Sequence, residues 1–191
     1  LLLDGRLVSR TVSGALEIGH MVLNAKGPQC GCGQRGCLEA LVAAEIASYF
    51  ETRGMTYRVI GDSGAASVRD VYADVAEAAE GGDEAALQVV KIVAELSSQA
   101  IINVINLIHV DEIVVESQLT ACRTFLETIS QAVAVRSLSR WAGCPIVRPS
   151  TLGSISPTVG AAYLAWDAFW GVDETLGRAI YAALGGNQSG E

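Results

Sequence analysis

The 191-residue sequence has few charged residues and very few basic ones. Charged residues make up only 18% of the chain, and 13 Lys and Arg stand against 21 Asp and Glu, for a net charge of −8. The scarcity of clustered basic residues argues against a chain that binds a nucleic-acid phosphate backbone by itself. Half of the residues are apolar, which excludes a disordered chain and allows one compact domain with a sizeable core. Neither a collagen-like glycine period nor a persistent heptad pattern is present.

The sequence also lacks an uninterrupted apolar run long enough to span a membrane. Its most apolar stretch, residues 89–115, is interrupted by Lys91, Glu95, Gln99, Asn103, Asn106, His109, Asp111 and Glu112. The first residues include neither an initiator Met nor the basic flank of a signal peptide. We therefore expect a piece of a longer, cytoplasmic protein with no membrane partner.

Strand-like and helix-like segments alternate along the chain, which is typical of a layered α/β domain. Asp4-Gly5 between two apolar runs predicts a hairpin over residues 1–9, and an extended segment follows over 15–24. A buried strand is predicted at 110–115 and another strand at 145–147. Helices are predicted over 38–52, 67–80, 83–107, 119–137, 156–171 and 173–184.

Helix ends are signalled by the residues that satisfy free backbone groups. Ser67 and Asp83 are the predicted caps of two of these helices, and Gly81-Gly82 ends the helix between them. The helix that begins after Asp83 is apolar on more than one face, so we expect it to lie centrally. We expect residues 1–191 to form a single domain.

Three of the five cysteines lie within eight residues, at Cys30, Cys32 and Cys37, and His20 precedes them. Three thiolates and one imidazole form a closed donor set that is typical of a structural zinc site, with no open position for a catalytic water. Gly31, Gly33 and Gly36 between them would let the backbone turn tightly. The sequence therefore predicts a zinc-binding loop over residues 20–37.

Two alternatives to this zinc loop remain open. The cysteines could be ordinary buried thiols beside a polar histidine. The loop could also be a nucleic-acid zinc knuckle, although it has few basic residues and no aromatic residue for base stacking. The isolated Cys122 and Cys144 are both predicted to be small buried apolar residues.

Two carboxylates lie close to these residues in sequence. Glu17 is three residues before His20, and Glu39 is two residues after Cys37, in the first turn of a predicted helix. Together with the imidazole, two such acids can accept several hydroxyl hydrogens of a polyol. Alternatively, Glu17 is a solvated surface acid and Glu39 only complements the helix dipole.

The order of these residues resembles the ROK family of repressors, open reading frames and sugar kinases. The motifs that carry the resemblance are Glu17-Ile18-Gly19-His20, Cys30-Gly31-Cys32-Gly33 and Gly36-Cys37-Leu38-Glu39-Ala40. A looser likeness extends over Asn103-Val104-Ile105-Asn106-Leu107 and Gly160-Ala161-Ala162. The whole chain is similar to the C-terminal portion of such a protein.

The resemblance implies a fold, a metal and a ligand. The fold would be the C-terminal lobe of an actin/hexokinase-like (ribonuclease H-like) ATPase. His20, Cys30, Cys32 and Cys37 would bind zinc, and Glu17, His20 and Glu39 would contact a sugar or sugar phosphate. The resemblance also implies a homo-oligomer.

Departures from the kinase pattern favour the repressor branch of the family. The family's phosphate-binding loop and catalytic Asp are not found in this sequence, and glycines that follow the strand at 110–115 in kinases are replaced by Glu116-Ser117-Gln118. Kinases also tend to have Ala-Gly-Glu where this chain has Ala15-Leu16-Glu17. We therefore expect the sugar-sensing and dimerisation region of a transcriptional regulator, which would bind DNA only through an N-terminal domain outside this chain. The alternative is the C-terminal half of an ATP-dependent, glucokinase-like sugar kinase.

Overall fold

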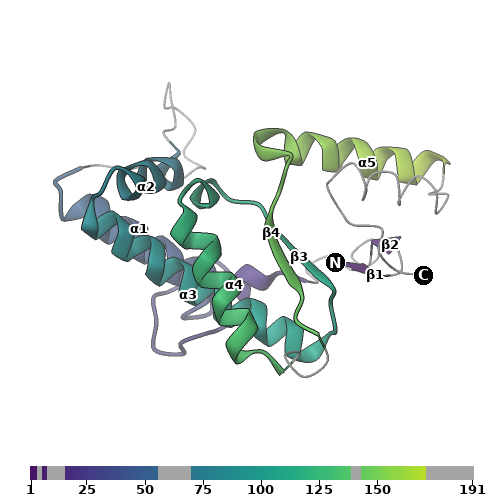
Figure 1. Ribbon diagram of the computed structural model, residues 1–191, viewed down its shortest axis with the longest axis horizontal. Coiled ribbons are helices and arrows are strands. Elements are labelled where there is room, and N and C mark those ends of the chain that lie inside the picture. The colour runs from purple at the N-terminus through teal and green to yellow at the C-terminus, as the bar shows by residue number, and fades with distance from the viewer. Residues whose placement is uncertain (4–5, 8–15, 56–69, 139–142, 171–191) are drawn as a thin grey trace. The chain divides into compact units, whose positions relative to one another are not determined.

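The computed structural model describes residues 1–3, 6–7, 16–55, 70–138 and 143–170 (Figure 1). The chain divides into two compact units. One combines the two ends of the chain, Leu1–Glu17 and Ser150–Glu191, and the other is Ile18–Pro149. The single domain expected for residues 1–191 stays a prediction.

The first unit contains the predicted hairpin. Strands β1 (Leu2–Leu3) and β2 (Arg6–Leu7) pair antiparallel, with Leu2 opposite Leu7. Helix α5 (Ser156–Trp170) begins at the predicted residue, after a 3₁₀ turn. The predicted helix over 173–184 lies outside the described residues.

The second unit is built around one long helix. Helix α3 (Glu84–Leu107) packs against α1 (Leu38–Glu51), α2 (Val71–Glu80) and α4 (Arg123–Arg136), as Figure 1 shows. The buried residues of these four helices and of the turn before α4 form one hydrophobic cluster. The central position expected for the helix after Asp83 is confirmed.

The exposed residues of α3 explain why so apolar a helix suits the core. Its polar residues Gln88, Lys91, Glu95, Gln99 and Asn103 are exposed and recur every three or four residues, so they form one stripe on one face. By length and composition α3 could cross a membrane, and 44% of its most apolar window is buried inside the protein. Its packing against three other helices accounts for the apolar composition of the remaining faces.

Two parallel strands accompany the helices. Strands β3 (Glu112–Val115) and β4 (Ile146–Pro149) pair with Val114 opposite Arg148, and Arg148 forms an ion pair with Glu112 across the two strands. Both strands differ in length from their predictions at 110–115 and 145–147. The first of them, predicted to be buried, is buried only in part, because Ile113 and Val115 pack against the core whereas Val114 is exposed.

Three other local predictions are corrected by capping and turn geometry. The cap of α2 is Asp70, whose carboxylate accepts hydrogen bonds from two backbone N–H groups, and not Ser67, which lies outside the described residues. The segment predicted to be extended over 15–24 contains a 3₁₀ turn, Ile18–His20. The predicted helix at 119–137 begins only at Arg123, after a 3₁₀ turn over Gln118–Ala121 that Ser117 caps.

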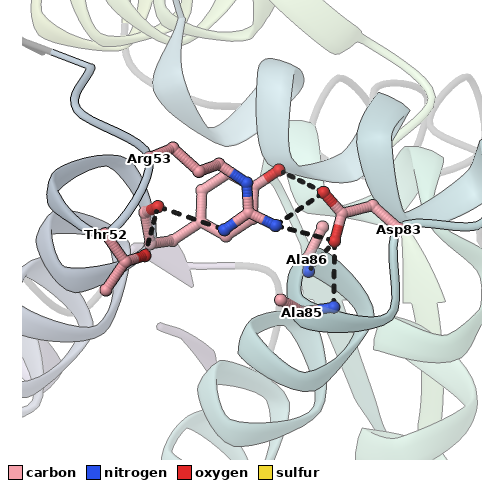
Figure 2. Close-up of polar contacts among 6 residues, drawn as sticks. Thr52, Arg53, Asp83, Ala85 and Ala86 are labelled. Atoms are coloured by element: carbon pink, nitrogen blue, oxygen red, sulfur yellow. Dashed lines mark hydrogen bonds and ion pairs between the residues drawn. The ribbon is translucent and has the colours of Figure 1, made fainter.

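The end of α1 and the start of α3 are joined by one charged cluster (Figure 2). The Asp83 carboxylate accepts hydrogen bonds from the backbone N–H groups of Ala85 and Ala86, which caps α3 as predicted. The same carboxylate pairs with Arg53 at 2.7 Å and accepts a hydrogen bond from the Tyr49 hydroxyl. The Arg53 guanidinium also lies 3.9 Å from the centre of the Tyr49 ring. One carboxylate thus caps a helix and ties it to its neighbour.

Replacement of Asp83 by Ala should lower the midpoint of thermal unfolding by about 2–4 °C, because α3 loses its cap. Asp83→Asn keeps an efficient cap and removes the charge, so its loss should be smaller. Calorimetry or circular dichroism on both variants would measure the difference.

The stability difference between the native chain and Asp83→Asn should depend on pH in a defined direction. The pKa of Asp83 is lowered from 3.8, first by the Ala86 backbone N–H and then by Arg53 and Tyr49. A lowered pKa stabilises the folded state above pH 3.8, and the stabilisation is lost as the pH falls through the folded-state value. The stability difference between the native chain and Asp83→Asn should therefore shrink below pH 3.8, and an unchanged difference would contradict this account.

Candidate metal centre

The predicted zinc loop is a backbone hairpin that returns to its own start. The Leu23 N–H donates to the Gly36 carbonyl at 2.9 Å, and the Leu38 N–H donates to the Met21 carbonyl at 2.9 Å. Between these two hydrogen bonds, Val22 and Cys37 form an antiparallel bridge. The turn that carries His20 is therefore held beside the first residue of α1.

Two glycines make this close return possible. Gly36 has a φ of +68°, and a Cβ there would lie 1.5 Å from the Asn24 carbonyl oxygen. A Cβ on Gly27 would lie 2.8 Å from the Gly36 Cα. Any side chain at either position would clash with backbone, so only glycine lets the two strands of the loop approach. Gly27 and Asn24 were not predicted from the sequence, although Asn and Gly-Pro are turn signals.

The tip of the loop is a tight turn from Cys30 to Gln34, which contains Cys32. The Cys30 N–H donates to the Gln34 carbonyl at 2.8 Å, and the Gly33 N–H donates to the Cys30 carbonyl. Gly33 has a φ of +93°, which confirms its predicted role in turning the chain. The same prediction for Gly31 is wrong, because its φ is not positive and a Cβ there would meet nothing within 4 Å.

The four predicted metal ligands come together at this hairpin. The ligand atoms of His20, Cys30, Cys32 and Cys37 all lie within 4.8 Å of one another. The Cys30 Sγ is 3.6 Å from the His20 Nδ1, and the Cys32 Sγ is 3.7 Å from the Cys37 Sγ.

These two separations fit a tetrahedral metal site. Bonds of about 2.3 Å to sulfur and 2.0–2.1 Å to nitrogen at tetrahedral angles place two sulfurs about 3.8 Å apart and a sulfur and a nitrogen about 3.6 Å apart. The four residues thus have the ligand types and the spacing needed to hold a metal ion such as Zn²⁺.

The three thiols differ in their exposure to solvent. Cys37 is fully buried and Cys30 is 5% exposed, whereas Cys32 is exposed. Burial raises the pKa of the Cys37 thiol to about 12 in the absence of a metal, while a backbone hydrogen bond at Gln34 is the first cause of a lowered pKa at Cys32. Because a metal binds thiolates, its binding here requires the release of protons.

Glu39 is the carboxylate that lies beside the cluster. It occupies the first turn of α1, and its Oε2 is 3.9 Å from the His20 Nδ1. Its side chain is 61% exposed, so it is free to face a ligand in solvent. Glu17 is exposed and ends the N-terminal segment, Leu1–Glu17, of the first unit. Its predicted role as a sugar contact, together with His20 and Glu39, stays a prediction.

Other residues near the cluster have structural roles. The Asn103 side-chain amide on α3 donates to the Met21 Sδ at 3.3 Å, which connects the His20 turn to the core helix. Arg35, within the loop, donates to the Gly27 carbonyl at 3.1 Å.

The two isolated cysteines behave differently from each other. Cys122 is buried, as predicted, and burial raises its pKa. Cys144 is exposed, so the prediction that it is buried is wrong. The difference arises because Cys122 directly precedes the core helix α4 and belongs to the hydrophobic cluster, whereas Cys144 precedes β4 in a connection.

Comparisons with known proteins match almost the whole chain. The sequence model of the ROK family covers residues 1–168. A glucokinase of Halalkalibacterium halodurans is 29% identical over 170 residues, which cover 84% of this chain and 50% of that protein. The DNA-binding transcriptional dual regulator NagC of Escherichia coli is 28% identical over 148 residues, which cover 76% of this chain and 36% of that protein.

The fold is also similar to solved structures. The ROK hexokinase of Thermus thermophilus matches with a TM-score of 0.64 and 24% identity, over 84% of this chain and 53% of that one. This likeness confirms the α/β fold. The chain spans half the length of the glucokinase and about a third of the length of the regulator.

Replacement of Gly36 by Ala should abolish metal binding, because a methyl group cannot occupy the space of the Asn24 carbonyl. Gly31→Ala is the matched control in the same loop, since its added methyl group meets open space. Elemental analysis of both purified variants should find zinc only in the control. Equal zinc contents would contradict the role assigned to the Gly36 contact.

Proposed function

Because this chain belongs to the ROK family, we propose that it is the sugar-sensing and dimerisation region of a cytoplasmic ROK transcriptional regulator. A sugar or sugar phosphate would bind beside a structural zinc site, in the C-terminal lobe of an actin/hexokinase-like fold. The observation that carries the proposal is the position of His20, which lies 3.6 Å from a cysteine sulfur and 3.9 Å from the exposed Glu39 carboxylate.

In this proposal the metal has a structural role. His20, Cys30, Cys32 and Cys37 would hold Zn²⁺, and the four protein ligands would leave no position for a reactive water. Bound zinc would cross-link the His20 turn to the loop and to the start of α1. The closed donor set and the two tetrahedral separations support this role.

The ligand would be recognised by hydrogen bonds to its hydroxyl groups. Glu39 can accept two of them, and Glu17 would supply the second carboxylate. The His20 Nδ1 faces the Cys30 sulfur, so with the metal on Nδ1 the other ring nitrogen, Nε2, would carry a proton and donate to a sugar oxygen. Loss of the metal would then also weaken sugar binding.

Sugar binding would act on DNA at a distance. A ligand that binds one arrangement of lobes or protomers more tightly than another shifts the population between them. The change would be transmitted through a homo-oligomer to an N-terminal DNA-binding domain outside this chain. The match to a DNA-binding regulator over 76% of the chain supports this reading.

A sugar kinase is the second candidate function, and the match to a glucokinase over 84% of the chain favours it. The segment after β3 favours the regulator. Ser117 caps a 3₁₀ turn there, and Glu116 is exposed. Where the kinases have glycines that let the backbone approach ATP, this chain would therefore present a carboxylate. ATP-dependent sugar phosphorylation by the protein with its upstream half restored would overturn the regulator.

Purified without chelator, the chain should hold one zinc ion, and its removal should lower the thermal midpoint by roughly 10 °C or more. A structural zinc site contributes several kcal/mol, and each kcal/mol shifts the midpoint of a chain of this length by about 2–4 °C. Elemental analysis and calorimetry before and after chelation test this. A metal-free, equally stable native chain would contradict the zinc site.

Replacement of Glu39 by Gln should weaken sugar binding about tenfold to a hundredfold, because a hydrogen bond to a charged group contributes about 1.5–3 kcal/mol. Glu51→Gln, at the exposed far end of the same helix, is the matched control and should leave the affinity unchanged. Calorimetric titration of the full-length protein with candidate sugars measures both. Normal affinity in Glu39→Gln, with normal zinc content, would rule out the carboxylate as a sugar contact.

A further inference from the structure

The three thiols of the cluster differ in how they are held. Cys37 is buried and fixed from both sides, by its bridge to Val22 and by the α1 helix that begins after it. Cys32 is exposed at the tip of the loop, next to Gly33, around which nothing lies within 4 Å of a Cβ position. A small oxidant in solvent therefore meets Cys32 before the other two thiols.

The Cys32 sulfur has two other thiols near it. The Cys37 sulfur lies 3.7 Å away, and the Cys30 sulfur, which is 3.6 Å from the His20 ring, lies within 4.8 Å. An oxidised sulfur at position 32 thus has a second thiol in contact, and that thiol belongs to a different strand of the loop.

We propose that Cys32 is a peroxide-reactive site, and that its oxidation ends in a Cys32–Cys37 disulfide that releases the metal from the cluster. The release step rests on the zinc site of the proposed function. The disulfide step rests only on the thiols of this chain.

The chemistry balances with hydrogen peroxide as the oxidant. The Cys32 thiolate attacks one peroxide oxygen, the O–O bond breaks, and a sulfenic acid and hydroxide form. The Cys37 thiol then loses its proton, and its sulfur attacks the Cys32 sulfur and displaces the second hydroxide. The two sulfurs together lose two electrons, and the peroxide is reduced to two hydroxide ions that take up protons to become water.

The disulfide removes two of the four metal ligands. His20 and Cys30 remain, which is fewer than a structural zinc site requires. Without the metal, the His20 turn is no longer cross-linked to the loop, so oxidation should lower the affinity for sugar. Reduction with added zinc should restore metal binding and sugar affinity.

The test uses the full chain carrying Cys144→Ser, which removes an exposed thiol outside the cluster, beside the native chain. Zinc content is measured first. Hydrogen peroxide is then added while a chromogenic chelator reports released zinc, and the disulfides are mapped by mass spectrometry after trypsin digestion. Cleavage at Lys26, Arg35 and Arg53 puts Cys32 and Cys37 on different peptides, 27–35 and 36–53, and fragmentation of the linked pair distinguishes Cys32 from Cys30.

The expected result is one zinc ion released per Cys32–Cys37 disulfide formed, at the same rate in both chains and reversed by dithiothreitol with zinc. A reduced Cys32, a disulfide that instead joins Cys30 to either thiol, or zinc retained after the disulfide forms would overturn the proposal. A chain that holds no zinc before peroxide overturns the zinc site of the proposed function, and the release step with it. In that case the disulfide map still decides whether Cys32 is the reactive thiol.

Discussion

The backbone contact between Gly36 and the Asn24 carbonyl is the constraint on which the candidate site depends. It allows the two strands of the loop to lie closer than any side chain would permit. As a result, Cys37 pairs with Val22, and Val22 lies only two residues after His20 in the sequence. The ligand atoms of four residues between positions 20 and 37 converge because the backbone of the loop returns to its own start, before any metal is considered.

The site is also attached to the hydrophobic core on two sides. Helix α1 begins directly after Cys37 and packs against α3, and Asn103 of α3 contacts Met21 beside the His20 turn. A charged cluster at Asp83 joins the far end of α1 to the start of α3. Glu39 is thus carried by a helix that is held at both ends, which fixes its backbone beside the His20 turn.

The chain belongs to the ROK family, and the proteins it is similar to include a glucokinase and a DNA-binding transcriptional regulator. The proposed zinc and sugar site would serve either function, because it would bind and orient a ligand without supplying a catalytic base. In the proposal, the segment that favours the regulator over the kinase follows β3, where Glu116 is exposed and Ser117 caps a turn. A redox-sensitive thiol pair in the same loop would add a second input to ligand binding.

The local sequence determined the alternation of helices and strands, the caps at Asp83 and Gly81, and the four candidate metal ligands, because periodicity, capping and donor chemistry act over a few residues. Only the tertiary structure decided that Gly36 is indispensable while Gly31 is not, and that Cys32 is exposed while Cys37 is buried. Those outcomes depend on which atoms from other parts of the chain lie against each residue in the folded protein. The pattern of residues along the sequence does not specify those contacts.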